Sequence, residues 1–295
     1  MPLPRSLLAV LSLLAGAVSA QTTAPRTDER GTGEATAKPA QAPMPDDLAA
    51  LARRLAAAHG LGEDEADIRS FRAELTVEPR DEKKQISIDV LVDFAAPSSL
   101  RCQVTEQGTR VERGFDPKIG PWAVVDGETV RLEGPEYTRD AEKVAKDLSL
   151  CRQMLRFLRP TRLLAGLRDP APVRQADLAI HRLRFTGCTV AEGTIDRLPT
   201  FAHGEVRARV RLFLDPKSDQ LLAVEAQPLD EDDKPDGIAE LVLLDAYDAA
   251  RGVRLPTKVT VYRLAGPGPE PVTTVHVRAI DPRREFPASH FAAPK

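Results

Sequence analysis

The sequence predicts a mainly β fold with added α-helices (α+β), built on one curved antiparallel sheet. Two observations indicate this class. Short segments with apolar residues at every second position recur between residues 68 and 280, and turns rich in Gly, Pro and Asp separate them. One long amphipathic helical stretch, residues 140–167, lies between two sets of these segments. Many short strands with few helices are typical of an antiparallel sheet that curves into a sandwich or barrel.

The first 45 residues are expected to precede the folded domain. A basic Arg5, an uncharged apolar run and a small-residue cleavage site at Ala20 indicate a secretory signal peptide, residues 1–20. Residues 21–45 are rich in Ala, Pro and Thr and contain almost nothing large and apolar, which predicts a flexible linker. Export would place the remaining single domain, residues 46–295, in the periplasm, with secretion as the alternative.

The domain is predicted to begin with a helix that leads into strands. An acidic start at Asp46 and Asp47, one apolar face over residues 48–55 and a stop at Gly60 define the helix. An Asp126-Gly127 turn indicates a tight hairpin. Alternating apolar positions predict the first strands at residues 68–77, 85–94, 100–105 and 122–132.

The middle of the chain is predicted to be helical and the remainder to return to strands. Apolar residues from Ala141 to Leu158 trace a helical face that Pro160 ends, and a second short helix is expected over residues 161–167. Gly187 indicates a β-bulge. The later strands are expected at residues 206–214, 221–227, 238–247, 258–264 and 272–280.

Composition and motifs exclude several functional classes. The chain has 41 basic and 44 acidic residues and a net charge of −3, which argues against nucleic acid as a partner. No nucleophile elbow, zinc-protease helix, phosphate loop or dinucleotide glycine motif is present. The histidines and cysteines show no metal-ligand spacing. We therefore predict a protein without enzymatic activity, with no catalytic residue, no metal and no cofactor.

The three cysteines, Cys102, Cys151 and Cys188, leave their oxidation state open. An exported protein tolerates disulfides, but an odd number leaves at least one thiol unpaired. We favour the interpretation that they are mostly small buried hydrophobic residues.

A row of basic residues, Arg207, Arg209 and Arg211, alternates with apolar residues on one predicted strand. The row could contact an anionic headgroup or an acidic partner. The favoured interpretation is the hydrated face of a strand, where charge also discourages edge-to-edge aggregation.

Six segments carry a family resemblance through their order and spacing: Ile68–Ala73, Phe94–Arg101, Val124–Val130, Val210–Leu222, Gly252–Val259 and Phe291–Lys295. They are respectively a first strand after an entry helix, a Pro-containing hairpin followed by Leu and Arg, an Asp-Gly hairpin, a late strand pair, a Gly-x-x-Leu-Pro-x-Lys turn, and a Phe-x-x-Pro ending. Together they resemble the bacterial outer-membrane lipoprotein carrier and sorting proteins, over most of residues 48–295. Such carriers tend to line their cavity with aromatic residues, whereas this chain has an aromatic content of only 4%. It therefore resembles a divergent member of the superfamily.

The resemblance implies an incomplete antiparallel barrel whose open side is covered by the N-terminal helix and by the central helical insertion as a lid. Acyl chains would then lie against the concave apolar face, and Arg101 is a candidate lid contact. The candidate cavity residues are Phe71, Leu75, Ile88, Val90, Val92, Phe94, Trp122, Val210 and Leu212.

These observations predict an exported, soluble, monomeric carrier that binds lipid or the acyl chains of lipoproteins, with transient membrane contact. The alternative is a periplasmic interaction or regulatory module on the same fold, with an envelope protein as partner and no lipid cargo. An interior without a cavity above about 300 Å³ would favour that alternative. The sequence names neither the cargo nor the partner.

Overall fold

A computed structural model gives the fold of the chain. It describes residues 45–61, 68–81, 84–85, 87–106, 108–180, 182–201, 204–266, 268–287 and 289–294. The predicted signal peptide, residues 21–44 of the predicted linker, and the histidines His181 and His203 lie outside the described residues.

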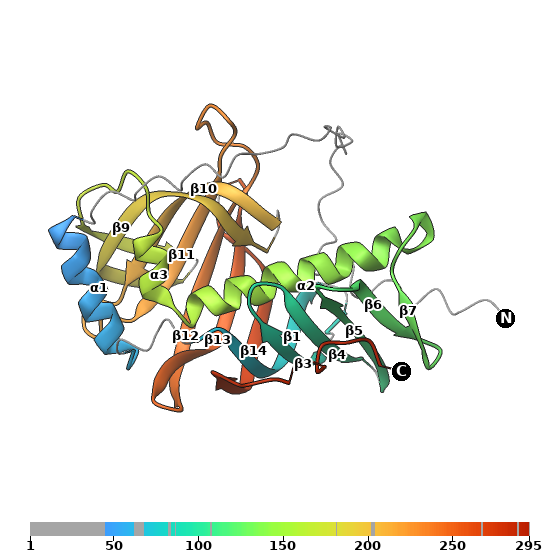
Figure 1. Cartoon of the computed structure of the whole chain (residues 1–295). Coiled ribbons are helices and arrows are strands. Elements are labelled where there is room, and N and C mark those ends of the chain that lie inside the picture. Colours follow the sequence, from blue (N-terminus) through green and yellow to red (C-terminus); the bar gives the residue numbers. More distant parts are fainter. Residues whose placement is uncertain are drawn as a thin grey trace, which may run out of the picture.

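The described residues form one 14-stranded antiparallel sheet with helices on one side (Figure 1). Along the sheet the strands follow the order β7-β6-β5-β4-β3-β1-β14-β13-β12-β11-β10-β9-β8, and β2 pairs with β1 beside this path. The strands of the first half are β1 (Ser70–Asp81), β2 (Lys84–Gln85), β3 (Ile88–Ala95), β4 (Ser99–Glu106), β5 (Thr109–Asp116), β6 (Gly120–Val125) and β7 (Glu128–Arg131). Those of the second half are β8 (Arg174–Ile180), β9 (Leu183–Thr200), β10 (Gly204–Leu214), β11 (Leu221–Pro228), β12 (Ala239–Ala250), β13 (Val253–Leu264) and β14 (Glu270–Pro282).

The first strand lies in the middle of the sheet, between β3 and the last strand, β14. From β1 the chain winds outward by hairpins to the edge strand β7. It then crosses to the other edge at β8 and winds back to β14. Because β7 and β8 end the sheet without pairing to each other, the curved sheet stays open. The predicted α+β class and incomplete antiparallel barrel are confirmed.

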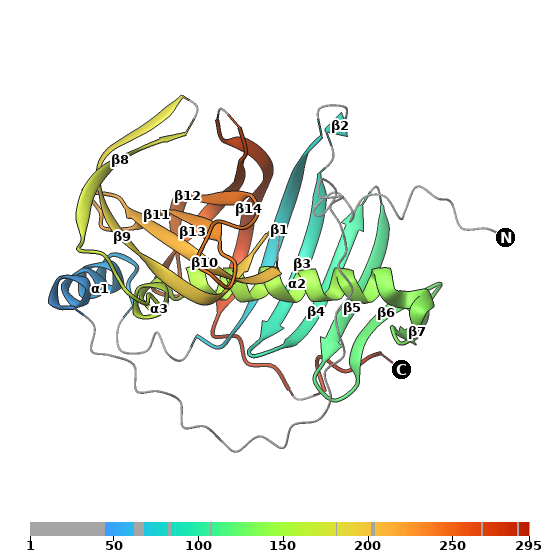
Figure 2. The same ribbon diagram turned by 90° about the horizontal axis from the view of Figure 1, so that it is seen from above.

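Three helices in the described part of the chain cover one face of this sheet: α1 (Asp46–Ala58), α2 (Thr138–Phe157) and α3 (Pro160–Ala165). A short 3-10 turn, Pro135–Tyr137, precedes α2. In the view from above, α2 runs across the sheet from β7 toward β9, and α1 and α3 lie beside the second half (Figure 2). Pro160 was predicted to end the central helix, and it also begins α3. The N–H that proline lacks would form no hydrogen bond within the helix at this first position.

Alternation predicted most strands, but not all of them. The hairpin of β3 and β4 and the hairpin of β6 and β7 form as expected. Asp126 and Gly127 both have positive φ, as a two-residue hairpin turn requires. Strands β5 and β8 were not predicted, because their segments mix polar and apolar residues without a clean period of two.

Two apolar clusters fill the space between the sheet and the helices. The first joins β1, β3, β4 and β6 to the α2 face formed by Val144, Leu148, Cys151 and Leu155. The second joins β9 to β12 with α1 and α3. A third cluster, which includes Phe213 and Leu243, lies on the opposite face of the second half, because neighbouring residues of these strands belong to the second cluster.

All three cysteines are free and buried in these clusters. Burial raises the pKa of the Cys102 thiol to about 12 and the pKa of the Cys151 thiol well above its ordinary value. These thiols therefore behave as the small hydrophobic residues that the sequence favoured.

A buried histidine joins α1 to the second half of the sheet. His59 follows α1, donates from Nδ1 to the Arg254 carbonyl at 3.0 Å, and accepts from the Leu221 N–H at Nε2 at 3.2 Å. Gly60 beside it has a φ of 65°, and a Cβ there would meet the Gly252 carbonyl oxygen at 2.2 Å. The predicted helix stop thus also brings two distant segments together.

His59 is expected to make the free energy of unfolding decrease as the pH falls. Burial lowers the pKa of His59 from 6.5 to about 4, so between these values the unfolded chain binds a proton that the folded chain excludes. The stabilisation is full above pH 6.5 and decreases as the pH falls toward 4, a change of about 3 kcal/mol. Urea titrations at several pH values should show that His59→Gln removes this dependence.

The matched control for His59→Gln is His276→Gln, because the His276 side chain on β14 is partly exposed. The control should retain the pH dependence of the wild type. A difference in stability between wild type and His59→Gln that stays constant from pH 7 to pH 4 would contradict the assignment.

Candidate functional site

Eight of the nine predicted cavity residues lie on the helix-covered inner face of the sheet. Six of them belong to the cluster under α2: Phe71, Leu75, Ile88, Val90, Val92 and Phe94. The other two, Val210 and Leu212, belong to the cluster under α1 and α3. Val90 is partly buried and the other seven are buried. The structure therefore brings these residues to one face but divides them between two halves of the sheet.

Trp122 and Arg101 lie on the opposite, outer face. Their neighbours along the strands, such as Ala123 and Cys102, point toward α2. The indole N–H of Trp122 donates to the Phe291 carbonyl at 3.1 Å, and the ring lies so close to Gly114 that a Cβ there would meet it at 2.6 Å. Trp122 therefore anchors the C-terminal segment on the face away from the helices, apart from the other eight candidate cavity residues.

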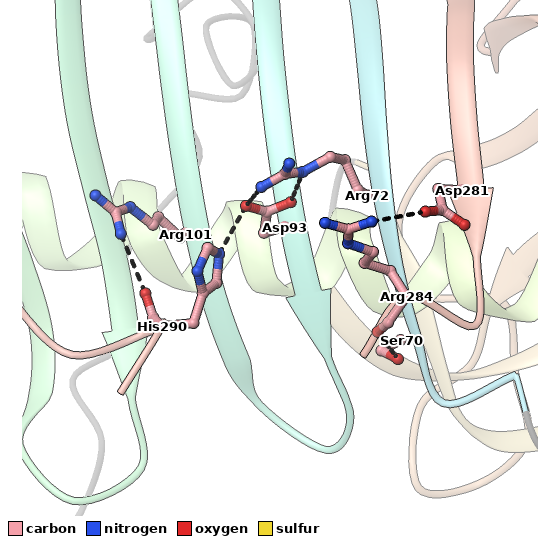
Figure 3. Close-up of polar contacts among 7 residues, drawn as sticks. All are labelled: Ser70, Arg72, Asp93, Arg101, Asp281, Arg284 and His290. Atoms are coloured by element: carbon pink, nitrogen blue, oxygen red, sulfur yellow. Dashed lines mark hydrogen bonds and ion pairs between the residues drawn. The ribbon is translucent and has the colours of Figure 1, made fainter. Parts of the chain in front are cut away.

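Arg101 contacts this C-terminal segment and not the helical cover. It donates to the His290 carbonyl at 3.2 Å (Figure 3). It also pairs with Glu112 at 2.6 Å. Nearby, Phe286 stacks on the His290 ring with centroids 4.8 Å apart. Strand parity already places Arg101 opposite Leu100 and Cys102, so the sequence held the signal for this placement.

A buried carboxylate organises the outer face. Asp93 accepts two hydrogen bonds from Arg72, at 2.6 and 2.7 Å, and a third from His290 Nε2 at 2.7 Å (Figure 3). Ser70 and Asp281 hold Arg284 at the start of the same C-terminal segment. These contacts fasten the end of the chain across β1, β3 and β4, so the polar groups on this face serve to hold the chain together.

A cavity of about 520 Å³ opens where the two inner clusters meet. The turn between β3 and β4, the end of α2, the start of α3, and strands β9 and β10 form its walls. Its apolar floor consists of Phe94 and Leu155 from the first cluster and of Leu163 and Ile195 from the second.

The remaining walls of the cavity are strongly basic. Among the described residues that line it, a single carboxylate, Glu205, faces the guanidinium groups, which belong to Arg152, Arg156, Arg159, Arg162 and Arg197. Glu205 accepts from Arg152 at 2.6 Å and from Arg197 at 2.7 Å. Burial raises the pKa of Glu205, but the two arginines outweigh this effect and hold its pKa below the ordinary value.

Arg156 is a partly buried member of this wall. Its guanidinium donates to the Arg197 carbonyl, and burial lowers its pKa below the ordinary value, a shift that Glu205 opposes and Arg197 increases. Arg152 also donates to the Pro97 carbonyl at 3.1 Å. Neutral carbonyls thus supply part of the hydrogen bonding in this basic wall.

This arginine group was not predicted, although the sequence contains a signal for part of it. Four of the arginines follow at intervals of four, three and three residues, which places them on one side of a helix. Two arginines of the basic row on β10 form ion pairs: Arg207 pairs with Asp233 at 2.8 Å, and Arg211 pairs with Glu225. The favoured interpretation of that row as a strand surface agrees with these pairs.

Within the described residues, no group of three or more His, Cys, Asp and Glu side chains is placed to hold a metal ion. In the same part of the chain, no helix has both the length and the apolar character needed to cross a membrane.

Solved structures similar to this chain include a LolA superfamily protein from Nitrosomonas europaea, at 10% identity and a TM-score of 0.45, covering 83% of this chain and 97% of that chain. An outer membrane lipoprotein-sorting protein domain from Vibrio parahaemolyticus is similar at 9% identity and a TM-score of 0.39, covering 83% and 96%. MucB, solved in complex with MucA(peri), is similar at 12% identity and a TM-score of 0.20, covering 81% and 100%.

No family model matches the sequence, and no curated protein matches it significantly.

The buried carboxylate on the outer face gives a test of how the C-terminal segment is held. Asp93→Ala leaves Arg72 and His290 without their acceptor, so we expect a loss of about 2–3 kcal/mol in the free energy of unfolding. Limited proteolysis should also cut the C-terminal segment sooner. Urea titration and mass mapping of the fragments measure both effects.

Asp89→Ala is the matched control, because Asp89 lies on the same strand and pairs with Arg278 while both side chains are half exposed. Its effect should be below about 1 kcal/mol. Equal effects of the two substitutions would show that the Asp93 contacts do not hold the segment.

Proposed function

We propose that the protein is a non-enzymatic carrier that holds an acyl chain of a lipid or lipoprotein between the helices and the inner face of the sheet. The observation that carries this proposal is the cavity of about 520 Å³, whose floor belongs to both inner clusters. Its volume exceeds the limit of about 300 Å³ below which a filled interior would be favoured.

The arrangement of the apolar surfaces supports this role. From the floor, the first cluster continues under α2 through Phe94 to Val92, and the second continues under α3 to Val210 and Leu212. An acyl chain that advances from the cavity would take the place of helix side chains against these surfaces. Each buried methylene contributes about 0.8 kcal/mol, so about six of them give about 5 kcal/mol before ordering costs.

The proposal includes the organisation and location of the chain. Residues 1–20 would direct export, residues 21–45 would serve as a flexible tether, and residues 46–295 would act as one domain in the periplasm. We propose a monomer that contacts the membrane only transiently, when it takes up or releases lipid.

A second candidate is an interaction module for an envelope protein, and a specific observation favours it. Phe71, Val210 and Leu212 are fully buried under the helices, so the deep inner face is filled in this conformation. A module of this kind would contact its partner through outer surfaces and would bind no lipid.

An uncharged lipid probe separates the two candidates. The purified protein should bind a fluorescent monoacylglycerol saturably. Ala96→Trp should weaken this binding at least tenfold, because Ala96 is exposed at the mouth of the cavity and a large ring there occupies it. Fluorescence titration measures the affinity.

Ala249→Trp serves as the control, since Ala249 is exposed on β12 and does not line the cavity. It should bind the probe as the wild type does. If no variant and no wild-type sample binds the probe saturably, the carrier proposal fails and the interaction module is favoured.

A further inference from the structure

The cavity under the helices has a surplus of positive charge that the acyl-chain proposal does not use. Five arginines and one glutamate of the described residues line it, so these residues carry a formal charge of 5 − 1 = +4. The whole chain has a net charge of −3. The surplus is therefore a local property of this cavity and not of the protein surface in general.

The arginines come from separate elements that converge. Arg152 and Arg156 lie on α2, Arg159 lies between the helices, Arg162 lies on α3, and Arg197 faces them from β9. Packing of α2 and α3 against β9 holds like charges on opposite walls of one cavity. Like charges that share a cavity repel each other, so an anion between them would relieve a repulsion already present.

Charge and apolar surface are separated by depth within the cavity. The side chains of Arg152 and Arg197 are 34% and 80% exposed, whereas Leu155, Leu163 and Ile195 are at most 8% exposed. The guanidinium groups thus form a rim around an apolar floor. A ligand that matches both parts has an anionic head and an apolar tail.

We propose that this rim binds the phosphate of a lipid headgroup while the tail of the same lipid lies on the apolar floor. The tail position rests on the proposed carrier function. A phosphate matches the rim because the planar guanidinium group donates paired hydrogen bonds to phosphate oxygens, and several arginines can share the three or four oxygens of one group.

Glu205 forms ion pairs with two arginines of the rim when no lipid is bound. It joins Arg152 to Arg197 across the cavity, while Arg156 donates to the Arg197 carbonyl. A phosphate would take the position beside Arg156 and Arg162. Binding of the phosphate should weaken as ionic strength rises, because the rim is partly exposed.

Three probes distinguish recognition of the phosphate headgroup from recognition of the acyl tail, because two of them each lack one of these parts. They are 1-lauroyl lysophosphatidic acid, 1-lauroylglycerol with the same chain but no phosphate, and glycerol 3-phosphate with no chain. Isothermal titration is done on the full mature chain, below the concentration at which the lipids form micelles. The wild type should bind the lysophosphatidic acid at least tenfold more tightly than either other probe, and only this preference should fall with added salt.

The variant that tests the rim is the double substitution R156Q/R162Q, which keeps a polar, hydrogen-bonding side chain at each position and removes two charges. It should lose about tenfold in affinity for the lysophosphatidic acid and keep its affinity for 1-lauroylglycerol. Arg209→Gln, an exposed position on β10 outside the cavity, is the matched control and should change neither. Thermal melting confirms that each variant is folded, and the single variant R162Q, at an exposed position, replaces the double one if that unfolds.

The outcomes distinguish this inference from the proposed function. Equal affinity of the wild type for the two lauroyl lipids overturns the phosphate rim and leaves the carrier proposal in place. Binding of glycerol 3-phosphate as tight as that of the lysophosphatidic acid indicates a site for free phosphate and overturns the lipid assignment. Absence of binding by all three probes overturns both proposals.

Discussion

The pairing of the first strand with the last constrains the whole molecule. Strand β1 uses both of its edges, one for β3 and one for β14, in registers that run from Phe71 to Pro79 along β14. The first half of the chain must therefore finish at one edge of the sheet while the second half begins at the other. A single connection has to cross the whole sheet, and α2 with α3 is that connection.

The crossing determines where the apolar surface and the charge can lie. A 20-residue helix at 1.5 Å per residue covers about 30 Å, which suits a path across several strands. The helix presents Val144, Leu148 and Cys151 to the sheet and thereby buries the inner face. Where α2 ends and α3 begins, the cover changes direction at Pro160, and the cavity opens beside this change.

Local patterning predicted much of the fold but less of the site. A period of two identifies strands such as β3 and β10, and a helical period identifies α1 and α2, because each buries one face. The run from Trp122 to Val125 is apolar throughout, so its parity could not tell which side chains face the helices. The resemblance pointed to an apolar cavity, and Trp122 was assigned to it although the structure places it on the outer face.

The complete arginine rim depended on information that local patterns contain only in part. The spacing from Arg152 to Arg162 indicates one side of a helix, but Pro160 divides that stretch into two helices. Arg197 lies 35 residues beyond Arg162. It reaches the same cavity only because β9, paired with β10 in the sheet, packs against α2. Such a site can be predicted only from the strand order of the sheet, and that order depends on the pairing of β1 with β14.

A filled inner face and the proposed carrier role are compatible because of the way α2 is attached to the sheet. The polar contacts of α2 with the sheet include an ion pair between Arg113 and Asp147 at 2.6 Å, where both side chains are nearly buried. Toward the other end, Arg152 binds Glu205 at the cavity rim. In the proposed carrier, an acyl chain would replace apolar side chains of α2 against the sheet, so the net change in apolar burial would be small. The rim contact is partly exposed and contributes about 1 kcal/mol or less, whereas the buried pair resists separation more strongly. At the end of α2 that carries the arginines, opening would also separate Gln153 from Glu240 and Arg156 from the Arg197 carbonyl, and in the proposed carrier a bound lipid headgroup would offer the rim arginines new partners.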